Sequence, residues 1–302
     1  MTGLTPGTLG AVASQLPAHW RTRFAPAPTG WLHLGHAVSA LYVWGIARAL
    51  GGRVLLRVED HDRVRSRREY ERALLDDLAW LGFEPDELVP PQRDRGAAYE
   101  AALATLEAEG MAYPCACSRR DIAGMTGDPF NAESRYPGTC RTRALEPLAH
   151  AARRVRMDAG AETFDDLRLG AQSQEPATQC GDVLVRDRDG RWTYQFAVAV
   201  DDRDQRIDLV IRGEDLLAST GRQVRLARLI GRAVPPRFLH HPLVHLPSGA
   251  KLSKSAGDTG LRELRAAGHS AAEVLGMAAH AAGLVRDVRP VRPDDVPMLF
   301  HG

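Results

Sequence analysis

Residues 21–58 read RTRFAPAPTGWLHLGHAVSALYVWGIARALGGRVLLRV, and this stretch decides the fold. Residues 21–26 predict a short strand that runs into a Pro/Gly turn. Residues 36–50 predict a mostly apolar helix that ends at Gly51-Gly52, and residues 53–58 predict a second strand. A strand, a helix and a strand within about 40 residues form a βαβ unit, which predicts an α/β protein with a parallel sheet.

The rest of the chain continues the alternation of helices and strands. Residues 111–179 break the pattern, because they are rich in Cys, Gly, Pro and Arg and hold few apolar segments; they predict an inserted or second domain. The break that Gly268 makes in the last Ala-rich segment predicts two helices there. The other expected elements are helices at 67–81, 95–109, 220–230 and 261–284 and strands at 182–185, 192–200 and 207–211, with a turn at 187–190 and a mixed segment at 238–246.

Composition limits the class of protein. The chain has 302 residues, 44% of them hydrophobic and 25% charged, with a formal net charge of +1. These values exclude a disordered chain and a polycation. Of the 39 basic residues only Lys251 and Lys254 are lysines, and both lie in the segment KLSKS at 251–255. A GC-rich genome, in which arginine codons replace lysine codons, explains why lysine is scarce. It does not explain why both remaining lysines lie in one short segment. A site that needs a compact, mobile ammonium group explains the location.

No segment predicts export or membrane insertion. No run approaches the ~18 apolar residues of a membrane span. The N-terminus lacks the basic start and apolar core of a signal peptide. Four cysteines are too few for a disulfide scaffold in a chain of this length. We therefore expect a cytoplasmic protein that does not bind membranes.

The segment HLGH at 33–36 stands where the first helix begins. A helix N-terminus attracts phosphate through its unpaired N–H groups and its dipole, and Gly35 would allow a nucleotide to approach the backbone closely. Neither a Walker motif nor a G-x-G-x-x-G follows the strand. On its own, a histidine pair at a helix start is more often structural than catalytic.

Together, HLGH and KLSKS resemble the two signatures of class I aminoacyl-tRNA synthetases. The order of the motifs, their separation and the βαβ context agree with that resemblance. It implies that ATP binds with Mg²⁺ and that lysines stabilise the charge moving onto pyrophosphate. By this resemblance the catalytic residues are His33, His36, Lys251 and Lys254, and the ATP-binding residues are His33, Gly35, His36, Lys251, Ser253 and Lys254.

Four further segments narrow the resemblance to the glutamyl/glutaminyl branch, over about residues 21–258. They are residues 23–30 (RFAPAPTG), 56–60 (LRVED), 194–202 (YQFAVAVDD) and 212–216 (RGEDL). The resemblance implies that Arg23 and Arg212 bind carboxylate groups of glutamate, for which a bidentate arginine is suited. Glu59 would then bind the α-ammonium and Tyr194 would line the pocket. The implied glutamate-binding set is Arg23, Phe24, Ala25, Pro26, Ala27, Glu59, Tyr194 and Arg212. Without the resemblance, Arg212 reads as a surface ion-pair residue and Tyr194 as a core residue.

Three cysteines, Cys115, Cys117 and Cys140, lie close together in a Gly/Pro-rich region and suggest tetrahedral zinc. Chemistry alone leaves the fourth ligand open among Cys180, His150 and Tyr136, since zinc can lower the pKa of a donor enough to bind a phenolate. The segment YPGTC at 136–140 resembles the zinc site of the glutamyl-Q tRNA(Asp) synthetases, which are shortened relatives of glutamyl-tRNA synthetase. That resemblance implies one structural Zn²⁺ held by Cys115, Cys117, Tyr136 and Cys140. Three unrelated buried thiols are the alternative.

The short segment after Ser255 is too small for the anticodon-binding region of a full glutamyl-tRNA synthetase, and it matches the glutamyl-Q enzymes. That resemblance implies an enzyme that activates L-glutamate with ATP and attaches it to queuosine in the anticodon of tRNA(Asp). Nothing in the sequence demands a dimer, so we expect a monomer. The alternatives are a truncated glutamyl-tRNA synthetase that charges a tRNA 3′ end, an inactive paralogue that binds RNA, and a small-acid adenylating enzyme of the pantothenate-synthetase type.

The expected organisation is a class I synthetase Rossmann-type catalytic domain with an inserted zinc subdomain and a short C-terminal helical region. Two arginine clusters are candidate phosphate contacts, which would make RNA binding salt-dependent. The clusters are Arg63, Arg65, Arg67, Arg68 and Arg72, and Arg135, Arg141, Arg143, Arg153, Arg154 and Arg156. The expected domain bounds are a flexible extension at 1–20, the two catalytic halves at 21–110 and 181–258, the insertion at 111–180 and a helical tail at 259–302.

Overall fold

The computed structural model describes residues 14, 16–126, 135–143, 151–244 and 260–300. The predicted βαβ unit forms. Strand β1 (Arg21–Phe24) pairs in parallel with β2 (Arg53–Leu56), and helix α2 (Leu34–Ala49) connects them. The short strand β3 (Glu87–Leu88) continues this sheet beside β2.

A second sheet continues from the other side of β1, in the order β9, β10, β6 and β7. Strands β9 (Leu209–Gly213), β10 (Arg237–His241) and β6 (Glu162–Asp166) are parallel, and β7 (Gly170–Gln174) forms an antiparallel edge.

The two sheets meet between β1 and β9, and the strand order runs in opposite directions on the two sides of this junction. A backbone hydrogen bond of 2.9 Å from Asp208 N to Arg21 O joins the start of β9 to β1. Strand β2 lies on the side of β1 that faces away from β9, and β10 lies on the side of β9 that faces away from β1. In open α/β sheets, ligands bind at such a switch point, outside the carboxyl ends of the strands.

Helix α7 (Tyr194–Asp204) occupies the segment for which the sequence predicts a strand, so the prediction for 192–200 is wrong. Within 192–200 only Trp192 keeps a β-type contact, an isolated bridge to Arg186. Residues 196–202 of the helix are all buried. A helix buried on every side shows no 3.6-residue periodicity, and a continuous apolar run then looks the same as a buried strand. The predicted strand at 182–185 is confirmed as β8 (Val183–Arg186).

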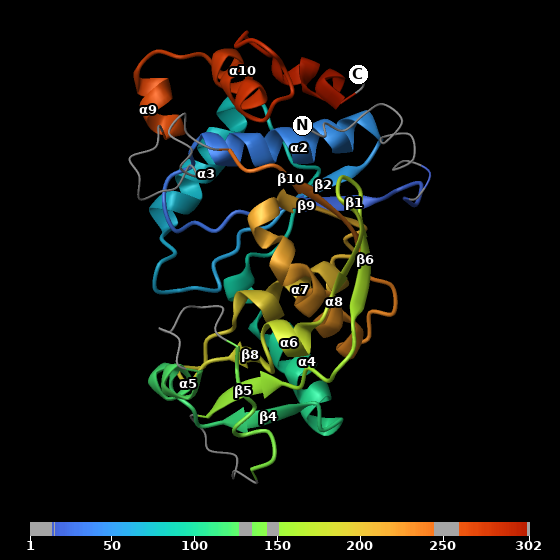
Figure 1. Cartoon of the computed structure of the whole chain (residues 1–302). Coiled ribbons are helices and arrows are strands. Elements are labelled where there is room, and N and C mark those ends of the chain that lie inside the picture. The colour runs from blue at the N-terminus through green and yellow to red at the C-terminus, as the bar shows by residue number, and fades with distance from the viewer. Residues whose placement is uncertain (1–13, 15, 127–134, 144–150, 245–259, 301–302) are drawn as a thin grey trace.

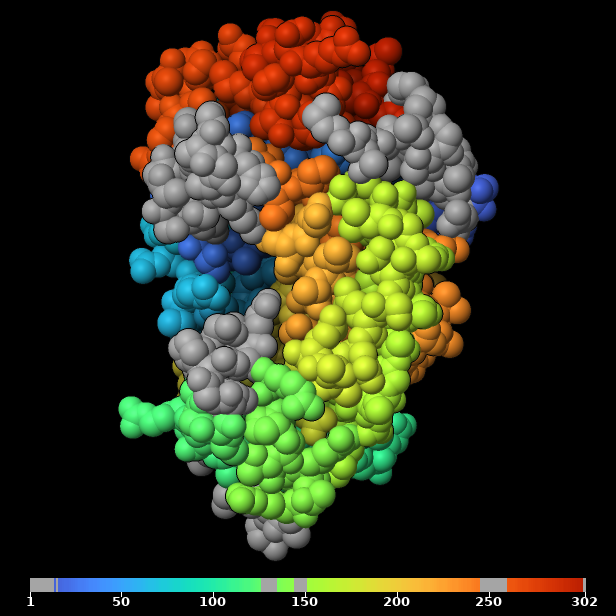
Figure 2. Space-filling model, viewed as in Figure 1, coloured from blue at the N-terminus to red at the C-terminus, as the bar shows by residue number. Residues whose placement is uncertain are grey.

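The region predicted as an insertion divides between two sheets. Strands β4 (Ala112–Cys115), β5 (Ala152–Val155) and β8 form a separate antiparallel sheet, in the order β4, β5, β8. The β6–β7 hairpin instead joins β10 of the parallel sheet, so residues 111–180 do not lie together as one block. Figure 1 shows β4, β5 and α5 at one end of the molecule and α9 and α10 at the other. Figure 2 shows the surface from the same side, with β4 and β5 in the green region and residues 260–300 in the orange-red region.

Helices at 68–80, 96–108, 220–229, 261–266 and 271–281 agree with the predicted segments, whereas the short helices at 119–126 and 176–179 lie in the region predicted as irregular. The predicted break near Gly268 is confirmed, since this glycine has φ +90. None of the described helices has the length and apolar character needed to cross a membrane. These remaining helices are α3 (Arg68–Trp80), α4 (Gly96–Ala108), α5 (Arg119–Thr126), α6 (Pro176–Gln179), α8 (Thr220–Leu229), α9 (Leu261–Ala266) and α10 (Ala271–Ala281), with 3₁₀ turns η1 (Gln92–Asp94), η2 (Glu214–Ser219) and η3 (Pro293–Phe300).

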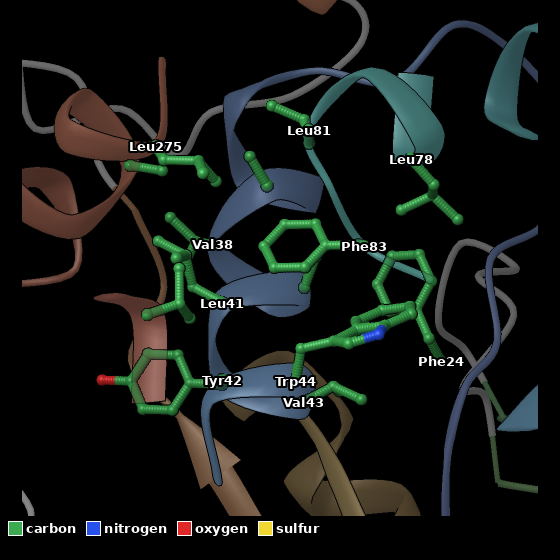
Figure 3. Close-up of a cluster of buried hydrophobic side chains, with 14 of the residues drawn as sticks. Phe24, Val38, Leu41, Tyr42, Val43, Trp44, Leu78, Leu81, Phe83 and Leu275 are labelled. Atoms are coloured by element: carbon green, nitrogen blue, oxygen red, sulfur yellow. The ribbon is translucent and has the colours of Figure 1, made fainter. Parts of the chain in front are cut away.

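Helix α2 lies at the centre of the main hydrophobic core, and residues 37 to 47 along it are all buried except Ser39. Figure 3 shows Val38, Leu41 and Trp44 of this helix among side chains that include Phe24, Phe83 and Leu275. Helix α10 and the 3₁₀ segment η3 cover the outer side of α2. Burial on both sides fixes this helix, and with it the position of its N-terminus at the switch point.

Candidate active site

A cavity of about 390 Å³ opens at the switch point. The carboxyl ends of β1, β9 and β10 and the N-terminus of α2 surround it. The structure brings ten predicted site residues together on its wall, and these are Arg23, Phe24, Ala25, Pro26, His33, Gly35, His36, Glu59, Tyr194 and Arg212. Ala27 is not on the wall. Lys251, Ser253 and Lys254 lie outside the described residues.

His33 and His36 form the N-terminal cap of α2. His33 Nδ1 accepts a hydrogen bond of 3.1 Å from Gly35 N, and His36 Nδ1 accepts one of 3.2 Å from His33 N. Because each Nδ1 is an acceptor, the neutral rings carry their proton on Nε2. Both imidazoles can therefore act as donors at the positive end of a helix dipole.

Gly35 lies in close contact with the same cap. A Cβ at this position would lie 3.0 Å from Cε1 and 3.1 Å from Nδ1 of the His33 ring. A side chain would press against the imidazole that caps the helix. The sequence suggested that a glycine allows a nucleotide to approach, and the structure adds a steric reason inside the protein.

Arg57 is the centre of a buried ionic network beside the cavity, and it is 0% exposed. Its Nη2 donates to Glu59 Oε1 at 2.9 Å, and its Nη1 donates to Asp202 Oδ1 and Gln205 Oε1, both at 2.8 Å. Burial opposes its charge, but the carboxylates of Asp202, Glu59 and Asp201 raise the pKa of Arg57, so it remains protonated. The network fixes the Glu59 carboxylate at the cavity wall.

Arg23 is neutralised within this network. It is 4% exposed, and its Nε lies 3.2 Å from Asp202 Oδ1. The same carboxylate therefore holds both Arg23 and Arg57. Burial would raise the pKa of Asp202, but these two arginines lower it, so the carboxylate remains ionised.

Arg212 is in a different situation, because its described hydrogen-bond acceptors are neutral. It is 6% exposed and so is not a surface ion-pair residue. Its guanidinium donates to His240 Nε2 at 3.0 Å, Gln223 Oε1 at 2.6 Å and Thr220 Oγ1 at 2.9 Å. Burial lowers the pKa of Arg212 from its usual value. A buried guanidinium that lacks an adjacent carboxylate favours an anionic ligand.

Sequence reasoning missed several residues that hold the site together. Asp166 and His240 contact each other behind Arg212 at 2.6 Å, and neither belongs to a recognised motif. His241 lines the cavity, and its Nε2 lies 3.0 Å from Ser39 Oγ. Arg57 could have been found, because an arginine within a strand of apolar residues is rarely buried without partners.

The three predicted cysteines form one cluster. The sulfur atoms of Cys115, Cys117 and Cys140 all lie within 4.8 Å of one another. The Tyr136 hydroxyl lies 3.4 Å from Cys115 Sγ and 3.7 Å from Cys117 Sγ, and it accepts a hydrogen bond of 2.9 Å from Cys140 N.

The competing fourth ligand Cys180 points elsewhere, since its thiol donates to the carbonyls of Pro176 and Gly181. His150 lies outside the described residues. The guanidinium of Arg154 lies 3.7 Å from the centre of the Tyr136 ring, and its Nε donates to Cys115 Sγ at 3.4 Å. Of the three candidates for the fourth ligand, Tyr136 is the one that the described structure brings to the cluster.

The arginine clusters are largely engaged within the protein. Arg154 is 7% exposed, so the expectation that it contacts phosphate is wrong. Arg153 pairs with Glu107 at 2.8 Å, and Arg141 pairs with Asp158. In the first cluster, Arg65 is 74% exposed although it pairs with Asp62. The first cluster is therefore the more accessible of the two.

Comparison with known proteins adds sequence and fold relationships. Residues 19–274 match the family described as tRNA synthetases class I (E and Q), catalytic domain. The chain is 42% identical over 298 residues to the glutamyl-Q tRNA(Asp) synthetase of Symbiobacterium thermophilum, covering 92% of this chain and 91% of the relative. It is 46% identical over 270 residues to that of Burkholderia cenocepacia, covering 86% and 89%.

Among solved structures, a glutamate tRNA ligase from Elizabethkingia meningosepticum in complex with its amino acid superimposes with a TM-score of 0.73 at 28% identity. The match covers 86% of this chain and 60% of that protein, so this chain spans less than two thirds of its length. A putative arginyl tRNA synthetase from Campylobacter jejuni, at 14% identity and a TM-score of 0.53, shares the fold.

Proposed function

Because the chain belongs to the class I glutamyl- and glutaminyl-tRNA synthetase catalytic-domain family, and within it to the glutamyl-Q tRNA(Asp) synthetases, we propose that its cavity activates glutamate and transfers it to queuosine in tRNA(Asp). The reaction has two steps. A glutamate α-carboxylate oxygen attacks the α-phosphorus of ATP, the bond to the β-phosphate breaks, and pyrophosphate leaves. A queuosine hydroxyl then attacks the acyl carbon of the adenylate, loses its proton and releases AMP.

The observation that carries the proposal is the charge pattern of the cavity. Arg212 supplies a buried positive charge whose hydrogen-bond partners are neutral, which suits a substrate carboxylate. Glu59, held by Arg57, supplies a fixed negative charge for the α-ammonium. Arg23 and Tyr194 complete the wall, where Arg23 would face the second carboxylate. A dicarboxylic amino acid carries the charges that this arrangement complements.

The phosphate side of the cavity is the N-terminus of α2. His33 and His36 would donate Nε2–H to phosphate oxygens, and Gly35 keeps this surface open. Lys251 and Lys254, with Ser253 between them, would approach the triphosphate from the segment after β10. Mg²⁺ bound with ATP would neutralise further charge on the phosphates. Catalysis would then rest on positioning and electrostatic stabilisation, with no enzyme nucleophile.

We propose that Cys115, Cys117, Tyr136 and Cys140 hold one structural Zn²⁺. In a tetrahedral site with Zn–S of ~2.3 Å and Zn–O of ~2.0 Å, donors lie roughly 3.8 Å apart for two sulfurs and 3.5 Å for sulfur and oxygen. The described spacings of 3.4, 3.5 and 3.7 Å fit those edges. When bound, zinc would cross-link the end of β4 to residues 136–140. The cation of Arg154 would offset the negative charge of the thiolates.

The deciding experiment follows labelled glutamate into RNA. The protein, which we expect to be a monomer, is incubated with ATP, labelled glutamate and tRNA(Asp) that contains or lacks queuosine, with tRNA(Glu) as a control. The tRNA is then cleaved, and the expected label is on the anticodon half of queuosine-containing tRNA(Asp) alone. Label on the 3′ half of tRNA(Glu) would establish a truncated glutamyl-tRNA synthetase instead. The absence of both label and glutamate-dependent ATP–pyrophosphate exchange would indicate an inactive paralogue.

A further inference from the structure

Three side chains from distant segments form a buried hydrogen-bonded chain that ends at the cavity. Asp166 lies at the end of β6, His240 in β10 and Arg212 in β9. Asp166 Oδ2 lies 2.6 Å from His240 Nδ1, and His240 Nε2 accepts from Arg212 Nε at 3.0 Å. The exposed fractions of Asp166, His240 and Arg212 are 2%, 0% and 6%. The first two do not line the cavity, so they could act on a ligand only through Arg212.

Asp166 is held as a carboxylate. Its Oδ1 accepts from the backbone N–H groups of Arg168 at 3.0 Å and Leu169 at 2.8 Å, and its Oδ2 also accepts from His240 N at 3.1 Å. Burial would raise the pKa of this carboxyl, but the bonds from His240 and the backbone lower it below the usual value. An ionised Asp166 must accept a hydrogen bond from His240 Nδ1–H, because a carboxylate has no proton to donate.

That proton assigns the tautomer of His240. With hydrogen on Nδ1, the neutral ring presents a lone pair at Nε2, and this lone pair accepts from Arg212. Burial lowers the pKa of His240, and the charges of Arg212 and Arg168 act in the same direction. Asp166 opposes them, and the Thr220 hydroxyl lies 3.3 Å from Nε2. A protonated ring would instead present a donor to the donor of Arg212.

We propose that Asp166 and His240 are positioning residues that orient the Arg212 guanidinium for a carboxylate of the substrate, and that Asp166 holds the His240 ring as a neutral acceptor beside it. The inference rests on the proposed function, because it takes glutamate as the ligand of Arg212. It assigns a role in substrate binding to the β6–β7 hairpin, which supplies Asp166 from a part of the chain without any synthetase motif.

Two substitutions of one residue separate positioning from simple packing. His240→Gln keeps an amide oxygen near the Nε2 position, where it can accept from Arg212. His240→Asn keeps a polar group near the Nδ1 position, where it contacts Asp166 but does not reach Arg212. His280→Gln, at an exposed position of α10, is the matched control. Each protein is assayed by ATP–pyrophosphate exchange, with and without tRNA(Asp), for kcat and for the KM values of glutamate and ATP.

We expect His240→Asn to raise the KM for glutamate about tenfold or more, the size expected for a lost hydrogen bond to a charged group. The KM for ATP should stay within about twofold, and His240→Gln should recover most of the affinity for glutamate. An unchanged glutamate KM in both variants, or equal losses in both, would overturn the positioning role while wild-type exchange leaves the proposed function intact. Wild-type protein without glutamate-dependent exchange would instead overturn the proposed function and this inference with it.

The tautomer is a second test that needs no substitution. In wild-type protein labelled with ¹⁵N-histidine, long-range proton–nitrogen spectra distinguish a protonated Nδ1 from a protonated Nε2. We expect His240 to be neutral with its proton on Nδ1 at pH 7. A proton on Nε2, or on both nitrogens, contradicts the proposal even if the variants do not fold.

Discussion

Replacing Arg57 with methionine tests whether the buried network beside the cavity holds the fold as well as the substrate. The substitution keeps most of the apolar stem and removes a guanidinium that is 0% exposed. Glu59 loses its bonds of 2.9 and 3.3 Å from this guanidinium. Asp202 loses a bond of 2.8 Å but keeps Arg23 at 3.2 Å. Glu59 is thus left without the Arg57 cation, Asp202 keeps one of two arginines, and Asp201, 3.8 Å from Arg57, keeps Arg95 at 2.8 Å.

Removing one partner of a buried ion pair costs about 3–5 kcal/mol, because the remaining charge is buried and uncompensated. The Arg23 contact that survives places the expected loss at the lower end, about 3 kcal/mol. A domain is stable by only about 5–15 kcal/mol in total, so the variant should unfold at a clearly lower urea concentration.

The assay is equilibrium unfolding in urea at pH 7, followed by circular dichroism. The matched control is Arg65→Met, which removes an arginine that is 74% exposed, and its loss should be below about 1 kcal/mol. If Arg57→Met also loses less than about 1 kcal/mol, the buried ion pairs of Arg57 do not stabilise the fold. Glutamate-dependent activity should fall in the Arg57 variant alone, since Glu59 is no longer oriented.

Four other changes have defined outcomes. Lys254→Ala should abolish pyrophosphate exchange and leave the circular dichroism spectrum unchanged; near-normal exchange would contradict the proposed role. Cys140→Ser should lose the bound zinc seen by mass spectrometry, whereas Cys180→Ser should keep it. The pKa of His241 is lowered by burial to about 4, so the unfolded chain takes up a proton first and stability falls as the pH drops from about 6.5 towards 4. His241→Gln should make that fall shallower in urea unfolding, and an identical slope would refute the assignment. Gly35→Ala, which places Cβ 3.0 Å from the imidazole that caps α2, should raise the KM for ATP several-fold with little change in melting temperature.

The sequence predicts well those parts of the fold that depend on local signals. The first βαβ unit follows from an apolar run with a glycine stop, and the break at Gly268 follows from one residue whose φ of +90 favours glycine. Helix α7 was predicted as a strand because burial on every side removes the periodicity that distinguishes the two. The pairing of β6 with β10 joins segments far apart in the chain, and no local pattern reports it.

The candidate site divides in the same way. Residues in motifs, such as Arg23 and Arg212, could be named from the sequence, and they lie on one cavity wall. Their supports could not. Asp166 and His240 contact each other across 74 positions of sequence, and a single sequence carries no sign of such a contact. The sequence thus indicates groups that line the cavity, while the structure identifies the groups in contact behind them.

The uncharged hydrogen-bond partners of Arg212 have a consequence for the protein without its proposed substrate. A buried cation whose hydrogen-bond partners are uncharged attracts small anions when no substrate carboxylate is bound. Inorganic anions such as chloride or phosphate would then compete with the amino acid for the same guanidinium. The apparent affinity for glutamate would therefore vary with the anion in the buffer as well as with its ionic strength.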